Sequence, residues 1–242
     1  MSNAIEIRNL VKTFGTKRAV DGISLDIPKG CLFSLLGVNG AGKTTTIRML
    51  MGLSKPDSGE IIILGKNPEK EPEETKKIAN FSPQETAVAP NLSVRENLEF
   101  VAEIYGADKK KAREKADEMI SFFSMEEVEG KKAKLLSGGW QRKLSIAMAL
   151  ITEPKVLFLD EPTLGLDVLA RKELWKVIEG LKGKVTIILT THYMEEAEKL
   201  SDLLAVMING KICAEGTVQE LLQKTGQNSL EDAFIAIAEE GK

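Results

Sequence analysis

The sequence is poor in cysteine, histidine and aromatic residues. It contains two cysteines and one histidine among 242 residues, and aromatic side chains make up 5% of the chain. The two cysteines, Cys31 and Cys213, lie in separate apolar segments and lack the paired spacing of a zinc site or a disulfide framework. We therefore expect both to be small, buried side chains of a protein that stays in a reducing compartment.

The sequence also lacks long hydrophobic runs and an excess of charge of one sign. Its longest apolar segments, including residues 31–38 and 156–159, are far shorter than the ~20 residues that span a lipid bilayer. The first residues do not show the basic and then apolar pattern of a signal peptide. The 33 basic and 36 acidic residues give a net charge of -3, which argues against nucleic-acid binding. We expect a chain that neither crosses a membrane nor is exported.

What the sequence does contain is an alternation of short apolar strands and helical segments. With 242 residues and 43% hydrophobic content, the chain is long enough for one sizeable domain. Predicted strands cover residues 5–9, 23–27, 31–36, 59–65, 78–82, 156–160, 185–190, 203–208 and 211–214. Predicted helices cover residues 43–51, 97–105, 137–150 and 168–181, with others beginning near residues 109, 217 and 229. Residues 93–96 and 217–220 have the pattern of capping boxes at helix starts. The charged segment 66–77 is predicted as a surface connection. This order predicts an α/β fold with a mainly parallel sheet.

A glycine-rich loop follows the predicted strand 31–36. Residues 37–44 read Gly-Val-Asn-Gly-Ala-Gly-Lys-Thr, the G-x-x-x-x-G-K-T pattern of a phosphate-binding loop, and a predicted helix comes next. In such a loop the glycines let main-chain amides approach phosphate oxygens, Lys43 reaches the β- and γ-phosphates and the Thr44 hydroxyl ligates Mg²⁺. Thr45 is expected at the α-phosphate. The nucleotide-contacting residues predicted in this loop are Asn39, Gly40, Ala41, Gly42, Lys43, Thr44 and Thr45.

Two carboxylates end the predicted strand 156–160. The segment reads Val-Leu-Phe-Leu-Asp-Glu and so places Asp160 and Glu161 at the carboxyl edge of the sheet, where ligands of α/β proteins bind. We expect Asp160 to orient Mg²⁺ or its waters. We expect Glu161 to polarise the attacking water, a role that contributes ~10²- to 10⁴-fold in rate. The alternative is an ordinary buried strand that meets a solvated turn.

The single histidine and one glutamine are further candidates. His192 follows the predicted strand 185–190 at the same sheet edge, where a neutral imidazole can hydrogen-bond the γ-phosphate or the lytic water. A lone histidine is more often structural. Gln84 follows the predicted strand 78–82, and its side-chain oxygen could meet Mg²⁺ or the water. By composition alone, an exposed turn glutamine is the better interpretation of Gln84.

A second glycine-rich turn occurs at residues 136–141, where Leu-Ser-Gly-Gly-Trp-Gln opens the predicted helix 137–150. Its main-chain amides and the positive helix end suit phosphate oxygens, so the chain carries two phosphate-seeking surfaces. Together with the motifs above, in the same order, this turn resembles the nucleotide-binding subunits of ABC transporters. In that family Gln84 is the Q-loop, residues 136–141 are the signature, residues 164–167 are the D-loop and His192 is the H-loop.

The resemblance implies an architecture and a set of nucleotide contacts. It implies a P-loop NTPase (RecA-like) core with a mainly parallel sheet, an N-terminal antiparallel β subdomain and an α-helical insertion that carries the signature motif. The single domain would consist of a β and RecA-like core (1–83 and 152–220), a helical subdomain (84–151) and a C-terminal helical tail (221–242). Phe14 would stack on adenine, and Val20 would also contact the nucleotide. In a head-to-tail dimer, the ATP bound by one copy would be capped by three residues of the other copy, which are Ser137, Gly138 and Gly139.

The resemblance also implies cofactors and partners. The cofactors would be ATP and Mg²⁺. The implied catalytic residues are Lys43, Gln84, Glu161 and His192, and the implied metal ligands are Thr44, Gln84 and Asp160. Residues 95–100 and 191–198 look most like the ABC-2 type branch, so we expect an exporter ATPase. It would work with a second copy of itself or a homologous subunit and with integral membrane permease subunits, in the cytoplasm at the inner face of the cell membrane.

Three alternatives remain open at this point: the ATPase subunit of a solute importer, a soluble ABC ATPase outside transport, and a module that senses ATP without turnover. Two positions also depart from the usual family pattern. Trp140 stands where Gln or Met is common, and Leu164 stands where a small or polar residue is frequent, which affects dimer packing more than the nucleotide site. The groove for a permease helix would lie near residues 84–105, with an apolar lip formed by Val88, Ala89, Pro90 and Leu92.

Overall fold

The structure is a computed structural model that describes residues 2–240, with side chains described as far as residue 239. Its centre is a six-stranded sheet in the order β5-β6-β7-β3-β8-β9. The first five of these strands run parallel and β9 pairs antiparallel with β8, which confirms the predicted mainly parallel sheet. The strands are β3 (Leu32–Leu36), β5 (Ala79–Ser82), β6 (Val156–Asp160), β7 (Thr186–Thr191), β8 (Leu203–Ile208) and β9 (Lys211–Gly216).

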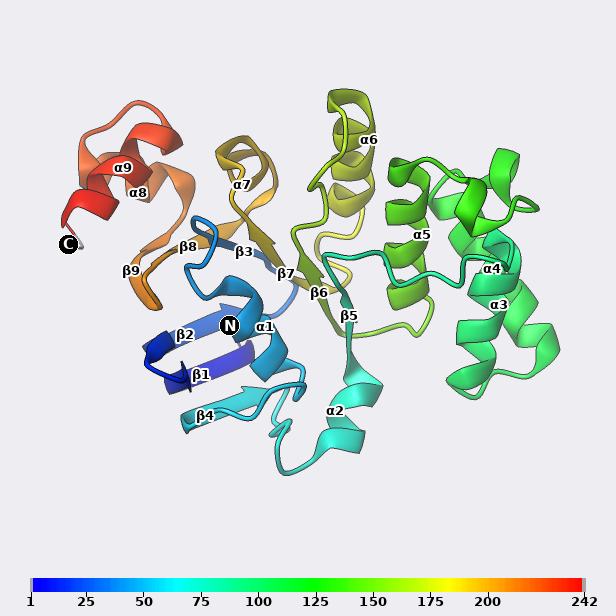
Figure 1. Ribbon diagram of the computed structural model, residues 1–242, viewed down its shortest axis with the longest axis horizontal. Coiled ribbons are helices and arrows are strands. Elements are labelled where there is room, and N and C mark those ends of the chain that lie inside the picture. Colours follow the sequence, from blue (N-terminus) through cyan, green and yellow to red (C-terminus); the bar gives the residue numbers. More distant parts are fainter. Residues whose placement is uncertain (1, 241–242) are drawn as a thin grey trace.

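A three-stranded antiparallel sheet, ordered β2-β1-β4, lies below the central sheet in Figure 1. It consists of β1 (Asn3–Phe14), β2 (Lys17–Pro28) and β4 (Ser58–Ile63). The expected antiparallel subdomain is thus present, but the predicted strands 5–9 and 23–27 cover only the half of a long hairpin that lies away from its turn. The hairpin is longer because its turn is tight: Phe14 pairs with Lys17, and Gly15 between them has a φ of 56°, which glycine adopts without steric penalty.

Nine α-helices surround the sheets in the described residues, and α3 to α5 gather at one end of the molecule while α8 and α9 lie at the other (Figure 1). Their bounds are α1 (Lys43–Leu50), α2 (Pro72–Ile78), α3 (Val94–Ile104), α4 (Lys109–Phe122), α5 (Gly138–Leu150), α6 (Val168–Glu179), α7 (Met194–Leu200), α8 (Val218–Thr225) and α9 (Leu230–Glu240). Two short 3₁₀ helices lie between α4 and α5, at Glu126–Val128 and Ala133–Leu135. The division into core, helical subdomain and tail stays a prediction.

Two predicted capping boxes fix the starts of helices. The Ser93 hydroxyl accepts from the Glu96 amide at 3.1 Å, and the Glu96 carboxylate accepts from the Ser93 amide at 2.7 Å. Thr217 and Glu220 form the same reciprocal pair at the start of α8, at 3.2 and 2.7 Å. Each box satisfies main-chain amides that a helix start leaves without partners inside the helix. α3 therefore begins directly after Ser93, earlier than residue 97.

The charged segment 66–77 is not only a surface connection, because its second half forms most of α2. Pro72 occupies the first helical position, where the missing N–H of proline removes no helical hydrogen bond. Lys76 pairs with Glu73 at 2.9 Å and Lys77 pairs with Glu74 at 2.7 Å, one turn apart along the helix. The charges that suggested a loop are therefore the exposed faces of a short helix.

Two further differences concern the C-terminal half. The sequence did not predict α7, because its seven residues are too few to show a helical period. Cys31 is buried as expected, but Cys213 is only partly buried because it lies on β9, at the edge of the sheet. Residues 241–242 of the predicted tail lie outside the described residues.

The central sheet is covered on both faces, since alternate side chains of its strands enter different cores. On β6, Leu157 and Leu159 pack in a cluster with α3 to α6, whereas Phe158 packs in a cluster with α1 and the antiparallel sheet. A third cluster joins β8 to α8 and α9. These cores hold the carboxyl ends of β3, β7 and β6 side by side. Within the described residues, no helix combines the length and the apolar character needed to cross a lipid bilayer.

Candidate nucleotide site

The loop between β3 and α1 has the backbone shape that a phosphate-binding loop needs. Gly40 and Gly42 have φ values of 82° and 113°, which side chains other than glycine rarely allow. A Cβ atom on Gly42 would collide with the carbonyl oxygen of Ala19, and one on Gly37 would collide with that of Met207. Glycine therefore lets the loop pack closely on β2 and β8. The start of α1 has no side-chain cap, so its amides are available to a phosphate.

Lys43 is the buried cation of this loop. Its ammonium donates to the carbonyl oxygens of Gly37 at 2.7 Å and Val38 at 3.2 Å, and it lies 3.2 Å from Oε1 of Glu161. The lysine side chain is only 4% exposed, so these contacts and not solvent surround its charge. Phosphate oxygens that reach the loop would compete with Glu161 for this ammonium.

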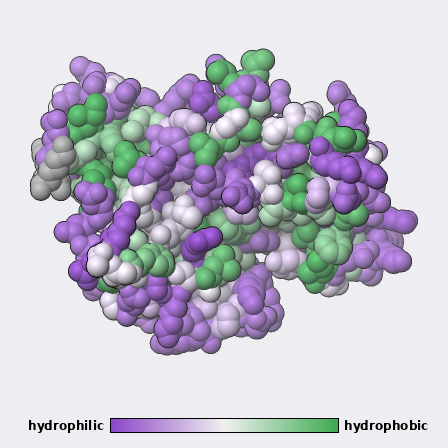
Figure 2. All heavy atoms as spheres, viewed as in Figure 1, coloured by the Kyte–Doolittle hydropathy of each residue, from purple (hydrophilic) through white to green (hydrophobic). Residues whose placement is uncertain are grey.

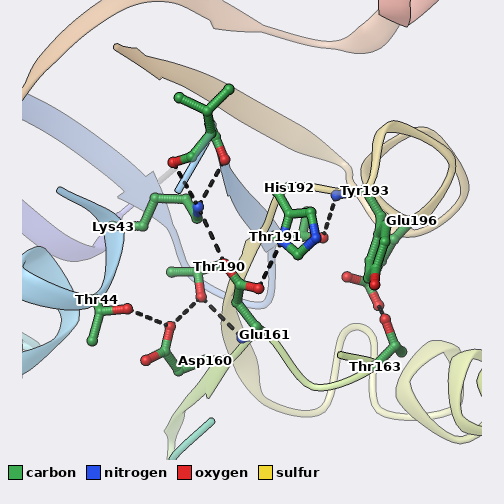
Figure 3. A network of polar contacts seen from close by, with 12 residues as sticks. Lys43, Thr44, Asp160, Glu161, Thr163, Thr190, Thr191, His192, Tyr193 and Glu196 are labelled. Atoms are coloured by element: carbon green, nitrogen blue, oxygen red, sulfur yellow. Dashed lines mark hydrogen bonds and ion pairs between the residues drawn. The ribbon is translucent and has the colours of Figure 1, made fainter. Parts of the chain in front are cut away.

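Asp160 ends β6 directly beside the loop. Its Oδ1 accepts a hydrogen bond from the Thr44 hydroxyl at 3.2 Å, and the hydroxyl of Thr190 on β7 donates to the same oxygen (Figure 3). Mg²⁺ takes oxygen ligands and is usually held by one or two protein oxygens together with substrate phosphates. The Thr44 hydroxyl and the Asp160 carboxylate, placed next to the phosphate loop, fit this ion.

Glu161 lies between a cation and the single histidine. Its Oε1 faces Lys43, and its Oε2 lies 2.7 Å from Nδ1 of His192 (Figure 3). Because an ionised carboxylate can only accept, Nδ1 carries the proton in this contact. The Glu161 amide donates to the main-chain and side-chain oxygens of Thr190, at 3.1 and 3.0 Å. Its φ of 46° is unusual for a residue with a side chain, and such positions gather at functional sites.

An open pocket of about 400 Å³ lies above the loop. The predicted site residues that line it are Phe14, Asn39, Gly40, Gly42, Lys43, Thr44, Thr45, Gln84 and Glu161. Asp160 and His192 do not line the pocket, but each contacts a residue that does. Asp160 accepts a hydrogen bond from Thr44, and His192 is hydrogen-bonded to Glu161. Val20 and Ala41 are buried and are not part of the pocket wall, so their contact with a nucleotide stays a prediction.

The three signature residues lie outside this pocket, at the head of α5. Ser137 is the N-cap of α5, and its side chain makes no capping hydrogen bond. Ser137 and Gly138 are exposed, and a Cβ atom on Gly139 would lie 3.1 Å from the Cβ of Ala170 on α6. One chain therefore does not bring its two phosphate-seeking surfaces together in one pocket.

Sequence reasoning missed several residues of the site. Lys17 and Ala19 line the pocket from β2, and they were not found because the hairpin is longer than predicted. Leu164 also lines the pocket, although the sequence suggested only an effect on dimer packing. Thr190 carried a usable signal, since it ends a predicted strand at the same sheet edge as Asp160.

Glu196 is a further buried polar residue near the site. It accepts hydrogen bonds from the Thr163 hydroxyl at 2.8 Å and from Nε1 of Trp175 at 3.0 Å. Burial raises the pKa of its carboxyl group, while these hydrogen bonds act in the opposite direction. Through these contacts α7, which begins next to His192, is joined to the loop that follows Glu161.

The glycine loop, the buried lysine and the two strand-end carboxylates, all on one parallel sheet, define a P-loop nucleotide-binding protein. Residues 20–164 match the model of the protein family described as "ABC transporter". This match covers more than half of the chain, which therefore belongs to the ATP-binding proteins of ABC transporters.

Individual relatives agree with this assignment. The chain is 40% identical to the daunorubicin/doxorubicin resistance ATP-binding protein DrrA of Streptomyces peucetius, over 95% of this chain and 70% of that protein. It is also 40% identical to the Nod factor export ATP-binding protein I of Burkholderia orbicola, over 90% of this chain and 72% of that protein. A solved ATP-binding subunit of an ABC transporter has the same fold, with a TM-score of 0.86 and 27% identity over 97% of this chain and 99% of that chain.

The protein is thus an ABC ATPase, a subunit that binds and hydrolyses ATP to drive a transporter. Proteins of this family dimerise and work with membrane permease subunits.

Proposed function

We propose that this chain powers an ABC exporter, and that it closes head to tail with a second copy or a homologous subunit around two ATP molecules. The names of the two relatives support export, because one is a drug-resistance ATP-binding protein and the other is an ATP-binding protein of Nod factor export. In such a complex the cargo contacts the permease subunits and not this chain.

The observation that carries the proposal is the separation of two phosphate-seeking surfaces on one chain. The pocket around Lys43 opens to solvent, and the amides at the head of α5 are exposed elsewhere on the molecule. Head-to-tail association of two copies would place each exposed α5 head over the pocket of the other copy. Each catalytic site would then consist of residues from both copies, as symmetric dimers with paired interfaces allow.

Exposed apolar side chains near these surfaces support such an interface. Leu164, at the pocket wall, is 37% exposed, and Val168 and Leu169 at the start of α6 are 55% and 76% exposed. Figure 2 shows hydrophobic atoms projecting at the top of the molecule, over this end of α6. Burial of these side chains between two copies would contribute favourable free energy in addition to the phosphate contacts.

Within each site, Glu161 would act as the general base. It would take the proton of the attacking water while a bond forms from the water oxygen to the γ-phosphorus and the bond to the bridging oxygen of ADP breaks. His192 holds the Glu161 carboxylate through its Nδ1 proton, so its Nε2 has a free lone pair and can accept a hydrogen bond from the attacking water. Lys43 would neutralise charge on the phosphates. Bound Mg²⁺, held by Thr44 and Asp160, would add further charge neutralisation.

The γ-phosphate would supply the contact that favours the closed dimer. It would be bound by Lys43 of one copy and by the amides near Ser137 of the other copy. A ligand shifts a conformational equilibrium only by such differential contacts. Hydrolysis and phosphate release would remove these contacts, so the dimer would open. The permease subunits would then switch the access of their pathway from one side of the membrane to the other.

The outer end of α3 offers a surface for the permease. Phe100 and Ile104 are 52% and 63% exposed and lie four residues apart, on one face of the helix. Of the lip residues expected from the sequence, Val88 packs against the core and only Pro90 is exposed. We therefore place the permease contact on α3, and this contact would hold the subunit at the inner face of the cell membrane.

Glu161→Gln tests the proposed function. The amide keeps the shape of the carboxylate but cannot take a proton, so phosphate release should fall at least ~10²-fold while ATP still binds. Dimers bound to ATP should then accumulate on a sizing column. Glu195→Gln is the matched control, because this exposed residue of α7 lies outside the pocket. Unchanged turnover of Glu161→Gln, with no ATP-dependent dimers, would contradict the proposal.

A further inference from the structure

Arg142 is a buried arginine that is surrounded by main-chain carbonyl groups. It lies near the head of α5 and is 3% exposed. Its Nε donates to the carbonyl oxygen of Pro162 at 2.7 Å, and its Nη2 donates to those of Glu161 at 2.7 Å and Asp160 at 3.2 Å. Its Nη1 donates to the carbonyl oxygen of Pro83. Within residues 2–239, no carboxylate group pairs with this guanidinium.

These contacts need arginine and not merely a positive charge. Burial lowers the pKa of Arg142 to about 10, mainly because the charged form loses its hydration. The group still carries its charge near neutral pH, and the carbonyl dipoles replace the lost water. Arginine presents its donors in a rigid fork, whereas lysine has one compact ammonium on a flexible stem. A lysine therefore cannot engage four carbonyl groups at once.

The carbonyl groups belong to the two segments that carry the catalytic side chains. Pro83 directly precedes Gln84 of the pocket wall, and Asp160 to Pro162 surround Glu161. The peptide groups of Glu161 are held from both sides, since its amide donates to Thr190 and its carbonyl accepts from Arg142. These bonds hold a backbone conformation that is unfavourable for glutamate on its own.

We propose that Arg142 is a positioning residue for hydrolysis, which holds Glu161 and the Gln84 segment in the geometry that the reaction needs. The inference rests on the proposed function, because it takes Glu161 as the general base. α5 also carries the exposed signature residues at its head. The helix that presents the cap to the ATP of the second copy thus also sets the position of the base in its own copy.

Arg142→Lys, with Lys143→Gln as the matched control, tests the inference in the full chain. Lys143 is the next residue of α5 and is also buried, but it pairs with Glu173 of α6 at 3.0 Å and lies 4.5 Å from the ring centre of Trp140. Arg142→Lys should lower kcat at least ~10²-fold, because misplacement of a catalytic group has effects of this order. Its KM and its affinity for a fluorescent ATP analogue should stay within about threefold, as should the kcat of Lys143→Gln.

A double-mutant cycle separates a positioning role from a general structural role. In the Glu161→Gln background there is no base to position, so adding Arg142→Lys should change the residual rate by less than about twofold. Dimers bound to ATP should still form. An equal loss of kcat in both backgrounds, or a rise in KM that accounts for the loss, would overturn the proposal.

Amide hydrogen exchange gives a second readout that does not depend on turnover. Arg142→Lys should speed exchange in residues 84–86 and 161–164 and leave the rest of the chain unchanged. If both Arg142→Lys and Arg142→Gln fail to fold, Arg142 is a stability residue and the proposal is wrong. If Glu161→Gln keeps full turnover, the proposed function itself fails. If Glu161→Gln loses turnover but Arg142→Lys keeps it, only the positioning role fails.

Discussion

The two phosphate-seeking surfaces of this chain are built in opposite ways. In the pocket, Lys43, Asp160 and Glu161 are 4%, 1% and 7% exposed, and each is held by side chains or carbonyl groups of its own chain. At the head of α5, Ser137 and Gly138 are exposed, and the Ser137 side chain makes no capping bond. The charged side chains of the pocket are thus paired within the chain, whereas the α5 head has no such groups and offers only main-chain amides to an acceptor from outside.

This difference indicates which step each surface controls. Groups that are already held in place need little reorganisation in the reaction, so the pocket residues are suited to hydrolysis. The free amides of the α5 head gain a partner only when a phosphate reaches them, so this surface is suited to ATP-dependent association. A substitution in the pocket should stop hydrolysis at the site built around that pocket. A substitution at the α5 head should stop hydrolysis at the site built around the pocket of the partner copy.

Replacement of Lys43 should have the largest effect. Lys43→Met removes the buried ammonium beside Glu161, so we expect kcat to fall at least ~10³-fold and ATP binding to weaken. Lys17→Met is the matched control, because Lys17 also lines the pocket but is exposed, and it should change KM by no more than about threefold. Phosphate release and calorimetric titration with ATP measure the two effects. Equal losses in both variants would show that burial of the charge does not matter.

Mixing of two inactive variants tests whether the surfaces work in different copies. Ser137→Arg blocks the α5 head and should lower turnover ~10²-fold on its own. In a mixed dimer with Lys43→Met, one site combines the intact pocket of the first variant with the intact head of the second. Phosphate release should therefore recover on mixing, to at most about a quarter of the wild-type rate, because half of the dimers are mixed and each has one intact site.

The control for this experiment mixes Lys43→Met with Glu161→Gln. Both changes lie in the pocket, so a mixed dimer contains no intact site and its activity should not exceed that of the separate variants. Recovery in this control would show that the two pockets share residues across the dimer. Absence of recovery with Ser137→Arg, under conditions where mixed dimers form, would show that pocket and head act within one chain.

The sequence predicted those features that one short segment determines. The phosphate loop contains its own glycines, and Gly40 and Gly42 do adopt the positive φ values that its motif requires. The strand that ends in Asp160 and Glu161 and the capping boxes of α3 and α8 are equally local, and the structure contains all of them. Their neighbours in sequence are enough to specify their conformation.

Features that depend on distant segments could not be predicted in this way. The sequence places Thr190 and Asp160 at the same sheet edge, but their hydrogen bond forms only because β6 and β7 are neighbours in the sheet, which the sequence does not show. The carbonyl of Ala19 excludes a side chain at position 42 only because the long hairpin folds back on the loop. Nothing near Arg142 in the sequence shows that its charge is buried against Glu161. Each of these features is a contact between distant segments of the chain and has no local sequence pattern that would predict it.

The smallest predicted effect concerns the open rim of the pocket, where Phe14 is 55% exposed and has the Lys12 ammonium 5.4 Å from its ring centre. Stacking of an adenine on this ring is worth roughly 0.5–1.5 kcal/mol, so Phe14→Ala should raise KM for ATP about 2- to 13-fold and leave kcat unchanged. Phe14→Tyr keeps the ring and should change neither value. A fall in kcat for Phe14→Ala would mean that the rim also orders the buried groups. An effect on KM alone would show that this exposed residue of the rim binds the nucleotide without ordering the buried groups that act on it.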